Sequence, residues 1–383
     1  MDKLHSPLDS LKSGSWFKLI GGASFQDLPA VRSLALAYAL AGADCIDTAA
    51  DPAVVAAVGE ALAIAQTLAG EATVRGFRPG SQPWLMVSLN DGEDPHFRKA
   101  TFDPTQCPTD CPRPCESICP ASAIAFSDIG GAPSGVIDAR CYGCGRCLPV
   151  CPVQLIATHP CGVALSEVGS LVGSMEIDAI EIHTQVGRFT DFQRLWSAIS
   201  TERKRLKLLA ISCPNGADLI DYLKALYDLI SPLPCPLVWQ TDGRPMSGDL
   251  GKGATRAAVE LGRKVLGAEL PGFVQLAGGT NQHTVAKLKA EGLLKPLVPR
   301  HPEILGGVAG VAYGSYARSL LLPILDKLEQ QSDDTHTLPH LENFPNLLWQ
   351  AVTQANTLVS PLKERQIQGD GARDRGLCGN YLG

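Results

Sequence analysis

Four apolar runs indicate the fold class: Ala179-Ile-Glu-Ile-His183, Leu208-Leu-Ala-Ile-Ser212, Leu237-Val-Trp-Gln240 and Phe273-Val-Gln-Leu276. Each run has the length and the apolar composition of a buried strand, and each leads into a segment whose apolar residues follow helical spacing. Strands that alternate strictly with helices pair in parallel, because the intervening helix carries the chain back to the start of the next strand. This part of the chain therefore predicts an α/β fold with a parallel sheet.

The same alternation continues on both sides of these runs. Further strands are predicted at Lys18–Gly21, Asp44–Asp47 and Trp84–Leu89 before them and at Gly310–Tyr313 after them. Eight β/α units in order predict a closed (β/α)8 barrel, in which the loops after the strands form the working face. An open, doubly wound parallel sheet is the alternative fold.

A cysteine-rich segment interrupts the alternation after the third strand. It ends in Cys141-Tyr-Gly-Cys144-Gly-Arg-Cys147-Leu-Pro-Val-Cys151-Pro152, which is the C-x2-C-x2-C-x3-C-P pattern of bacterial ferredoxins. Three thiolates must converge on one small iron–sulfur cube, so the loop between them must be tight, and Gly143 and Gly145 let the backbone curl. The fourth cysteine of such a run is a ligand of a second cluster.

The same segment begins with a related run, Cys107-Pro-Thr-Asp-Cys111-Pro-Arg-Pro-Cys115-Glu-Ser-Ile-Cys119-Pro120. Its first two gaps are one residue longer than in the standard pattern, and the residues after its Cys-Pro pair resemble those after Cys151-Pro152. This internal repeat predicts two halves that exchange ligands. Cluster A would be held by Cys141, Cys144, Cys147 and Cys119, and cluster B by Cys107, Cys111, Cys115 and Cys151.

The cysteine spacing determines the type of each cluster less directly than it determines the ligands. Cluster A is expected to be [4Fe–4S], whereas the longer spacing leaves cluster B as [4Fe–4S] or [3Fe–4S]. Cys161 is either a spare ligand or an unliganded thiol beside the module. Zinc is an alternative metal, but zinc sites seldom combine two C-x3-C-P runs with matching sequels. Cys45, Cys213 and Cys235 lie in or beside apolar strands and are expected in the core.

Polar residues mark the expected working face of the barrel. Asp47, Asn90, His183, Asn215 and Asp242 fall at or just past strand ends. The last two strands are followed by a second set that is typical of a phosphate site and would suit flavin mononucleotide: Gly278, Gly279, Gly314, Ser315 and Arg318. Ordinary tight turns into helices are the alternative for these glycines, and a hydrogen-bonded strand end is the alternative to a catalytic His183.

Composition restricts the partners and the compartment. The net charge of −6 argues against a protein that binds nucleic acid by neutralising phosphates. No apolar stretch reaches the ~18 residues of a membrane span, and residues 1–15 lack a signal-peptide apolar region, so a cytoplasmic protein is expected. In a reducing compartment, thirteen cysteines are expected to bind metal or remain free thiols, because disulfides are rare there.

The expected organisation follows from these features. The first three β/α units occupy residues 16–92, the iron–sulfur module is an insertion at 93–162, and the remaining units occupy 163–330. A linker and a C-terminal helix are expected at 331–365 and a disordered tail at 366–383. Apolar residues at helical spacing within Pro345–Val359 predict that this helix docks on the barrel, with partner binding as the alternative.

The first cysteine run, the second run and the downstream segments Trp239–Thr255 and Gly310–Arg318 resemble the cyanobacterial light-dependent period protein (LdpA) family. The resemblance extends over most of the chain. It implies an iron–sulfur protein that feeds cellular redox state, and hence light, into the circadian clock, and association with clock proteins such as KaiA and CikA. Only the eight cysteines carry over from the resemblance as functional residues.

Two classes of function remain open. The protein is expected to be a redox sensor or electron-transfer protein whose shape or binding changes with its clusters. The alternative is an oxidoreductase in which the clusters pass electrons to a flavin or a substrate at the barrel mouth. Either function requires a redox partner, which the sequence does not identify.

Overall fold

The computed structural model describes a set of ranges with short gaps between them. They are residues 6–21, 28–92, 98–119, 123–126, 135–137, 141, 145, 147–160, 165–243, 254–294, 306–331 and 339–376, without the side chains of 98, 160, 254 and 365–376.

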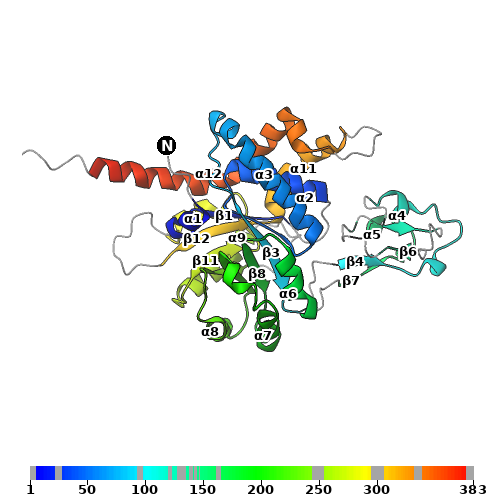
Figure 1. The fold of residues 1–383 in the computed structure, drawn as a ribbon, viewed down its shortest axis with the longest axis horizontal. Coiled ribbons are helices and arrows are strands. Elements are labelled where there is room, and N and C mark those ends of the chain that lie inside the picture. The colour runs from blue at the N-terminus through cyan, green and yellow to red at the C-terminus, as the bar shows by residue number, and fades with distance from the viewer. Residues whose placement is uncertain are drawn as a thin grey trace, which may run out of the picture.

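Eight parallel strands close into a barrel in the order β1-β12-β11-β10-β9-β8-β3-β2 (Figure 1). They are β1 (Trp16–Ile20), β2 (Cys45–Ala49), β3 (Trp84–Asn90), β8 (Ala179–His183), β9 (Leu208–Pro214), β10 (Leu237–Asp242), β11 (Phe273–Ala277) and β12 (Val308–Tyr313). The first and last strands complete the ring, with Trp16 opposite Gly310. The predicted (β/α)8 barrel is therefore confirmed, and the open doubly wound sheet is excluded.

The helices that follow the strands cover the outside of the barrel. They are α2 (Leu28–Ala41), α3 (Pro52–Val74), α6 (Leu165–Ser174), α7 (Phe189–Ala198), α8 (Leu219–Ile230), α9 (Ala254–Leu266), α10 (Thr284–Ala290) and α11 (Ser315–Glu329), with a short η2 (Arg203–Arg205) before β9. The main core lies between this layer and the strands. Its aromatic centre is Phe17, which stacks on Tyr38 and Tyr313 with ring centroids 5.7 and 5.1 Å away.

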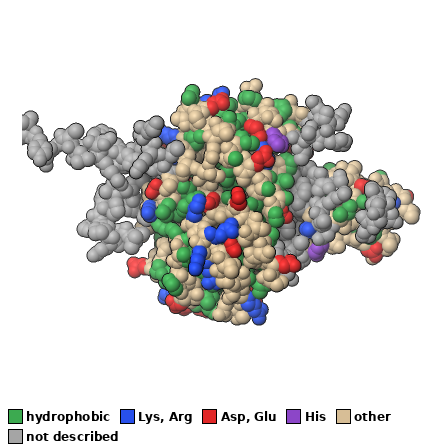
Figure 2. Space-filling model, viewed as in Figure 1, with side chains coloured by type: hydrophobic (Ala, Val, Ile, Leu, Met, Phe, Trp, Pro, Cys, Tyr) green, Lys and Arg blue, Asp and Glu red, His purple; other side chains and the backbone are tan. Residues whose placement is uncertain are grey.

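The surface over the barrel is mixed in charge. On the face shown in Figure 2, Lys and Arg side chains lie among Asp and Glu side chains and apolar ones. Such a mixture is typical of a solvated surface.

A short N-terminal helix, α1 (Pro7–Ser13), closes one end of the barrel. Ser6 caps it, because the Ser6 side chain accepts from the backbone of Asp9 while Asp9 bonds back to Ser6. Leu11 of α1 is fully buried against a second apolar cluster inside the barrel, which includes Trp16. Gly310 permits this packing, since a Cβ there would lie 2.2 Å from the Trp16 carbonyl oxygen.

The cysteine-rich segment forms a small module beside the barrel (Figure 1). Its elements are β4 (Arg98–Thr101), η1 (Pro104–Gln106), α4 (Pro114–Ser117), β5 (Ile124–Ala125), β6 (Gly135–Val136), α5 (Cys147–Val150) and β7 (Ala157–Pro160). The antiparallel pair β4–β7 forms its base. The barrel is continuous across the point where the module leaves it, because β3 pairs directly with β8, Leu89 opposite Ile182.

The C-terminal helix α12 (Pro345–Gly376) follows η3 (Leu341–Asn343) and lies against α2, α11 and β1. Its apolar stripe is buried, with Leu348, Val352 and Val359 at most 2% exposed, which confirms the docking predicted from the spacing. The helix continues to Gly376, past the end predicted at residue 365. Residues 377–383 lie outside the described residues, so disorder there stays a prediction.

One helix corrects the expectation about apolar length. Among the described residues, α3 is long and apolar enough to cross a membrane by length and composition alone, and 28% of its apolar 18-residue stretch is buried. A core helix of a globular domain meets the same criteria. Here Val55, Val58 and Leu62 of α3 are buried in the main core.

Candidate functional site

The first cysteine run is shaped by two short turns of helix. Asp103 caps η1, since its side chain accepts from the Thr105 backbone at 2.9 Å, and Cys107 follows directly with its N–H on the Pro104 carbonyl at 3.2 Å. Arg113, at a left-handed φ of 52°, turns the chain into α4, where Cys115 is buried. The guanidinium of Arg113 lies 4.3 Å from the centre of the Phe126 ring, which fixes this turn to the rest of the module.

Four thiols of the module share one neighbourhood. Desolvation, together with the nearby thiols of Cys111 and Cys151, raises the pKa of Cys107. Desolvation also raises the pKa of Cys115, with contributions from Cys151 and Cys107. Cys151 thus lies with the first run although it belongs to the second, and four ionised thiols so close together would repel one another unless a cationic centre lay between them.

The two Cys-Pro segments have the same local structure. The backbone N–H of Leu155 donates to the Cys151 sulfur at 3.3 Å, and that of Ala123 donates to the Cys119 sulfur at 3.2 Å. Desolvation alone would raise the pKa of Cys151, but the N–H groups of residues 153–156 outweigh it and lower the pKa. The segment after Cys151 therefore favours the thiolate of Cys151, which is the form that binds metal.

The remaining cysteines fall into three groups. Cys119, Cys141 and Cys147 line the small core of the module. Cys144 lies outside the described residues, as do Gly143 and Cys161, so the fourth ligand predicted for cluster A has no described position. Cys45 and Cys213 are buried in the barrel and Cys235 packs against its core, as predicted; burial raises the pKa of Cys213 to about 12 and that of Cys235 to about 11.

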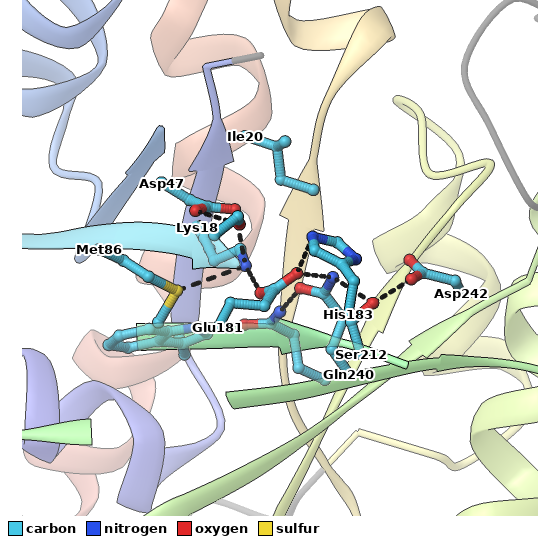
Figure 3. A network of polar contacts seen from close by, with 12 residues as sticks. Lys18, Ile20, Asp47, Met86, Glu181, His183, Ser212, Gln240 and Asp242 are labelled. Atoms are coloured by element: carbon cyan, nitrogen blue, oxygen red, sulfur yellow. Dashed lines mark hydrogen bonds and ion pairs between the residues drawn. The ribbon is translucent and has the colours of Figure 1, made fainter. Parts of the chain in front are cut away.

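A second concentration of functional groups lies inside the barrel (Figure 3). Lys18 on β1 is fully buried; its Nζ forms an ion pair with Glu181 on β8, lies 3.1 Å from the Asp47 carboxylate on β2 and 3.6 Å from the Met86 sulfur. Burial opposes the charge of Lys18, but the two carboxylates outweigh it and raise its pKa. Lys18 therefore remains an ammonium group at physiological pH.

Glu181 joins this ion pair to the far side of the barrel. Its Oε1 accepts from the Gln240 amide at 2.7 Å and lies 3.1 Å from Nε2 of His183. The Gln240 amide also reaches the Ser212 hydroxyl at 3.2 Å, and Ser212 in turn donates to Asp242. Burial raises the pKa of Asp47 and of Asp242.

The polar residues predicted at strand ends lie in different places in the structure. Asp47, His183 and Asp242 come together in this network, whereas Asn90 accepts locally from the Gly92 backbone at 3.0 Å and Asn215 accepts from Lys264 at 3.0 Å on the outside. Sequence reasoning missed a further set, which lies within strands at positions that point into the barrel: Lys18, Glu181, Gln240 and Gln275. The sequence feature that could have identified them is a polar side chain within an otherwise apolar strand.

The glycine-rich strand ends are also neighbours. Gly278 and Gly279 leave β11 with positive φ values of 62° and 99°, and Thr280 donates to the Ala312 carbonyl of β12 at 2.6 Å. Ser315 opens α11 after Gly314, and Arg318 donates to the Ile20 carbonyl at 3.1 Å and to the Ser315 hydroxyl at 3.3 Å. Burial lowers the pKa of Arg318 to about 10. A phosphate or flavin mononucleotide here stays a prediction.

Comparison with known proteins relates both regions to one family. A model described as the Light dependent period A C-terminal domain matches residues 171–361, and one described as the LdpA Fe-S cluster-binding domain matches residues 107–161. A relative from Synechococcus elongatus named Light dependent period A is 49% identical over 358 residues, which are 94% of this chain and 94% of the relative.

Among solved structures, the barrel enzyme (S)-3-O-geranylgeranylglyceryl phosphate synthase from Thermoplasma acidophilum aligns with 94% of this chain and 100% of its own. It is 12% identical, with a TM-score of 0.29, which is too low to support an inference.

Proposed function

The chain belongs to the light dependent period A family. We propose that it is an iron–sulfur redox sensor that relays cellular redox state, and hence light, to the circadian clock. The family relation itself gives an iron–sulfur cluster-binding domain and a link to light-dependent period. The sensing role, the cytoplasmic location and the association with clock proteins such as KaiA and CikA are parts of the proposal.

One observation carries the proposal: the thiol of Cys151 is near enough to Cys107 and Cys115 to contribute to the raised pKa of each. It supports a cluster B held by Cys107, Cys111, Cys115 and Cys151, and leaves Cys141, Cys147 and Cys119 for cluster A together with Cys144. When bound, such clusters supply reversible one-electron chemistry at a potential tuned by hydrogen bonds to sulfur. The chain contributes the thiolates and the N–H groups of Leu155 and Ala123 that point at them.

Cluster B is the better candidate for the sensor. Its loop departs from the standard spacing and is stiffened by Pro108, Pro112 and Pro114. Whether cluster B is [4Fe–4S] or [3Fe–4S], its constrained ligands make it the first of the two clusters to change on oxidation. The change would loosen residues 107–115, most of which are at least partly exposed, and so alter a surface that partners can read.

The test measures metal content and ligand pairing on full-length protein purified without oxygen. We expect about eight iron and eight sulfide per chain, or about seven iron if cluster B is [3Fe–4S]. In Cys151→Ser, electron paramagnetic resonance should lose the signal of cluster B and keep that of cluster A at least in part. Cys213→Ser, a core cysteine of the barrel, is the matched control and should keep both. Zinc as the main metal, or loss of cluster A alone in Cys151→Ser, would refute the ligand assignment.

The sensing role needs its own measurement. Binding of the purified chain to KaiA and to CikA is compared with the clusters reduced and with the clusters oxidised. We expect the affinity to change between the two states, and the difference to disappear in Cys151→Ser. Equal affinity in both redox states would exclude the sensor function while leaving the clusters themselves in place.

The polar interior of the barrel supports a second candidate, an oxidoreductase with its active site at the barrel mouth. In that case clusters and a bound flavin mononucleotide would exchange electrons near Gly278, Gly279, Gly314, Ser315 and Arg318. The visible spectrum separates the two candidates, because a flavin adds resolved absorption bands and fluorescence to the broad absorption of the clusters. A spectrum that contains only cluster absorption excludes the flavin enzyme.

A further inference from the structure

The interior of the barrel is divided into two unlike halves. The half closed by α1 is apolar and contains Leu11, Trp16, Met86, Leu208 and Val238. The half toward the carboxyl ends of the strands contains the network around Lys18 and Glu181 (Figure 3). Barrel interiors are usually filled by branched apolar side chains, and burying charge there is costly. If these positions only stabilised the fold, apolar side chains would fill the interior without the cost of buried charge.

The charges in this network do not balance. Lys18 is its one lysine among the described residues, and its contacts are with Asp47 and Glu181. Asp242, the third carboxyl, has the Ser212 hydroxyl as its hydrogen-bond donor within the described part of the chain. With Asp47, Glu181 and Asp242 all ionised, negative charge exceeds positive charge even when His183 is protonated.

The carboxyl that forms no ion pair with the described Lys and Arg residues, Asp242, lies on the solvent-accessible side of the network. The His183 side chain is 33% exposed, in contrast to Lys18 and Glu181 at 0%, and Asp242 is partly exposed at the end of β10. Figure 3 shows His183 and Asp242 on either side of Ser212, above the Glu181–Gln240 contact. A molecule entering from the mouth would meet these two side chains before the buried ion pair.

We propose that this mouth binds a small molecule with a positively charged nitrogen, held between Asp242 and the His183–Glu181 pair. The nitrogen donates hydrogen bonds to the Asp242 carboxylate and adds the positive charge that the network lacks. Ser212 and Gln240 hold the acceptors in place from below. Burial raises the pKa of Asp242, and among the described residues no ion pair with Lys or Arg offsets this cost. The site is separate from the cysteines and goes beyond the sensing role.

A metal ion fits this mouth less well than an organic cation. Within the described residues, a group with three ligand atoms close enough for one ion occurs elsewhere, at Glu60, His340 and Glu342. There Arg32 already occupies both carboxylates, at 2.8 Å from Glu60 and 2.5 Å from Glu342. The carboxyls of the barrel are spread over three strands and suit an extended donor.

The test uses three probes of nearly equal size on the full-length, cluster-loaded chain: propylammonium, propanol and propionate. Tiny ligands bind weakly, so binding is followed by saturation-transfer difference NMR. We expect propylammonium to bind and the other two not to. In Asp242→Asn its affinity should fall about tenfold or more, since one partner of a charged pair is removed. Asp221→Asn, on an exposed carboxyl of α8, is the matched control and should bind as the unmodified chain does.

The proposal fails if the unmodified chain binds propylammonium no better than propanol, a result that needs no variant. It also fails if folded Asp242→Asn binds propylammonium as tightly as the Asp221→Asn control. If Asp242→Asn does not fold, His183→Gln takes its place, and equal binding by that variant would likewise overturn the site.

Discussion

The barrel and the cysteine module are held together by different means. The barrel has an extensive apolar core, continuous between its strands and its helices. The described core of the module consists of Ala100, Cys115, Ile124, Cys147 and Ile156, so two of its five members are proposed ligands. Burial of apolar surface can account for the first region but not for the second. We infer that the module depends on a metal centre bound by its cysteines, whereas the barrel depends on its own packing.

The largest expected effect is loss of the module when its clusters are removed. Chelation of iron without oxygen should expose the backbone of β5, β6 and α4 to hydrogen exchange, because metal binding at such sites contributes free energy on the order of 10 kcal/mol. The strands β3 and β8 should keep their protection, since they pair directly with each other. Hydrogen exchange followed by mass spectrometry measures both regions in one sample. Equal loss of protection in the module and the barrel would show that the barrel depends on the metal as much as the module does.

The next effect concerns the charged interior of the barrel. Lys18→Met leaves Asp47 and Glu181 buried without their cation, and should lower the free energy of unfolding by roughly 3–5 kcal/mol. Urea unfolding followed by circular dichroism measures it. Lys224→Met, which removes an exposed partner 3.8 Å from Asp221, is the control and should leave stability unchanged. A loss below about 1 kcal/mol in Lys18→Met would mean that the network tolerates unpaired carboxyls.

A smaller effect is expected where α12 is fastened to the barrel. Lys363 donates to both oxygens of Asp44 at 2.6 Å and to Ser10 at 3.0 Å, and Lys363→Met should cost about 2 kcal/mol in unfolding free energy.

Lys207→Met is the matched control for this contact, because Lys207 lies at the same 2.6 Å from Asp178 but is 57% exposed. Its loss should cost less than about 1 kcal/mol. Equal losses in the two variants would show that burial adds nothing to this contact.

The smallest effect is a dependence on pH. Burial raises the pKa of Asp242 in the folded chain, so the fold binds its proton more tightly than the unfolded chain does. That contribution is present at low pH and is lost as the pH rises through the folded pKa. Asp242→Asn cannot lose it, so the melting temperature of the variant relative to the unmodified chain should increase from acidic to neutral pH. A difference that stays constant with pH, or decreases, contradicts the prediction.

Sequence patterns were sufficient for the barrel and partly sufficient for its interior. Strand positions could be predicted because both faces of a parallel strand are buried and therefore apolar. The partners of Lys18 could not, since Asp47 and Glu181 are far from it in the chain and meet it only through the closure of the barrel. The proximity of Cys151 to Cys107 was predictable, because the fourth cysteine of each repeated run is expected to bind the cluster of the other run. The end of α12 was not, because the sequence beyond residue 365 has no apolar stripe at helical spacing.

The direct pairing of β3 with β8 has a consequence for the order of folding. While the module is unfolded, that pairing must close the whole loop between Asn90 and Ala179. Once β4 and β7 have paired, the effective loop consists only of the short connections on either side of the module. The entropy of closure depends on the logarithm of loop length, so this shortening favours closure by about 1 kcal/mol. We therefore expect iron loading, where it stabilises the module, to speed the completion of a barrel whose strands contain none of the proposed ligands.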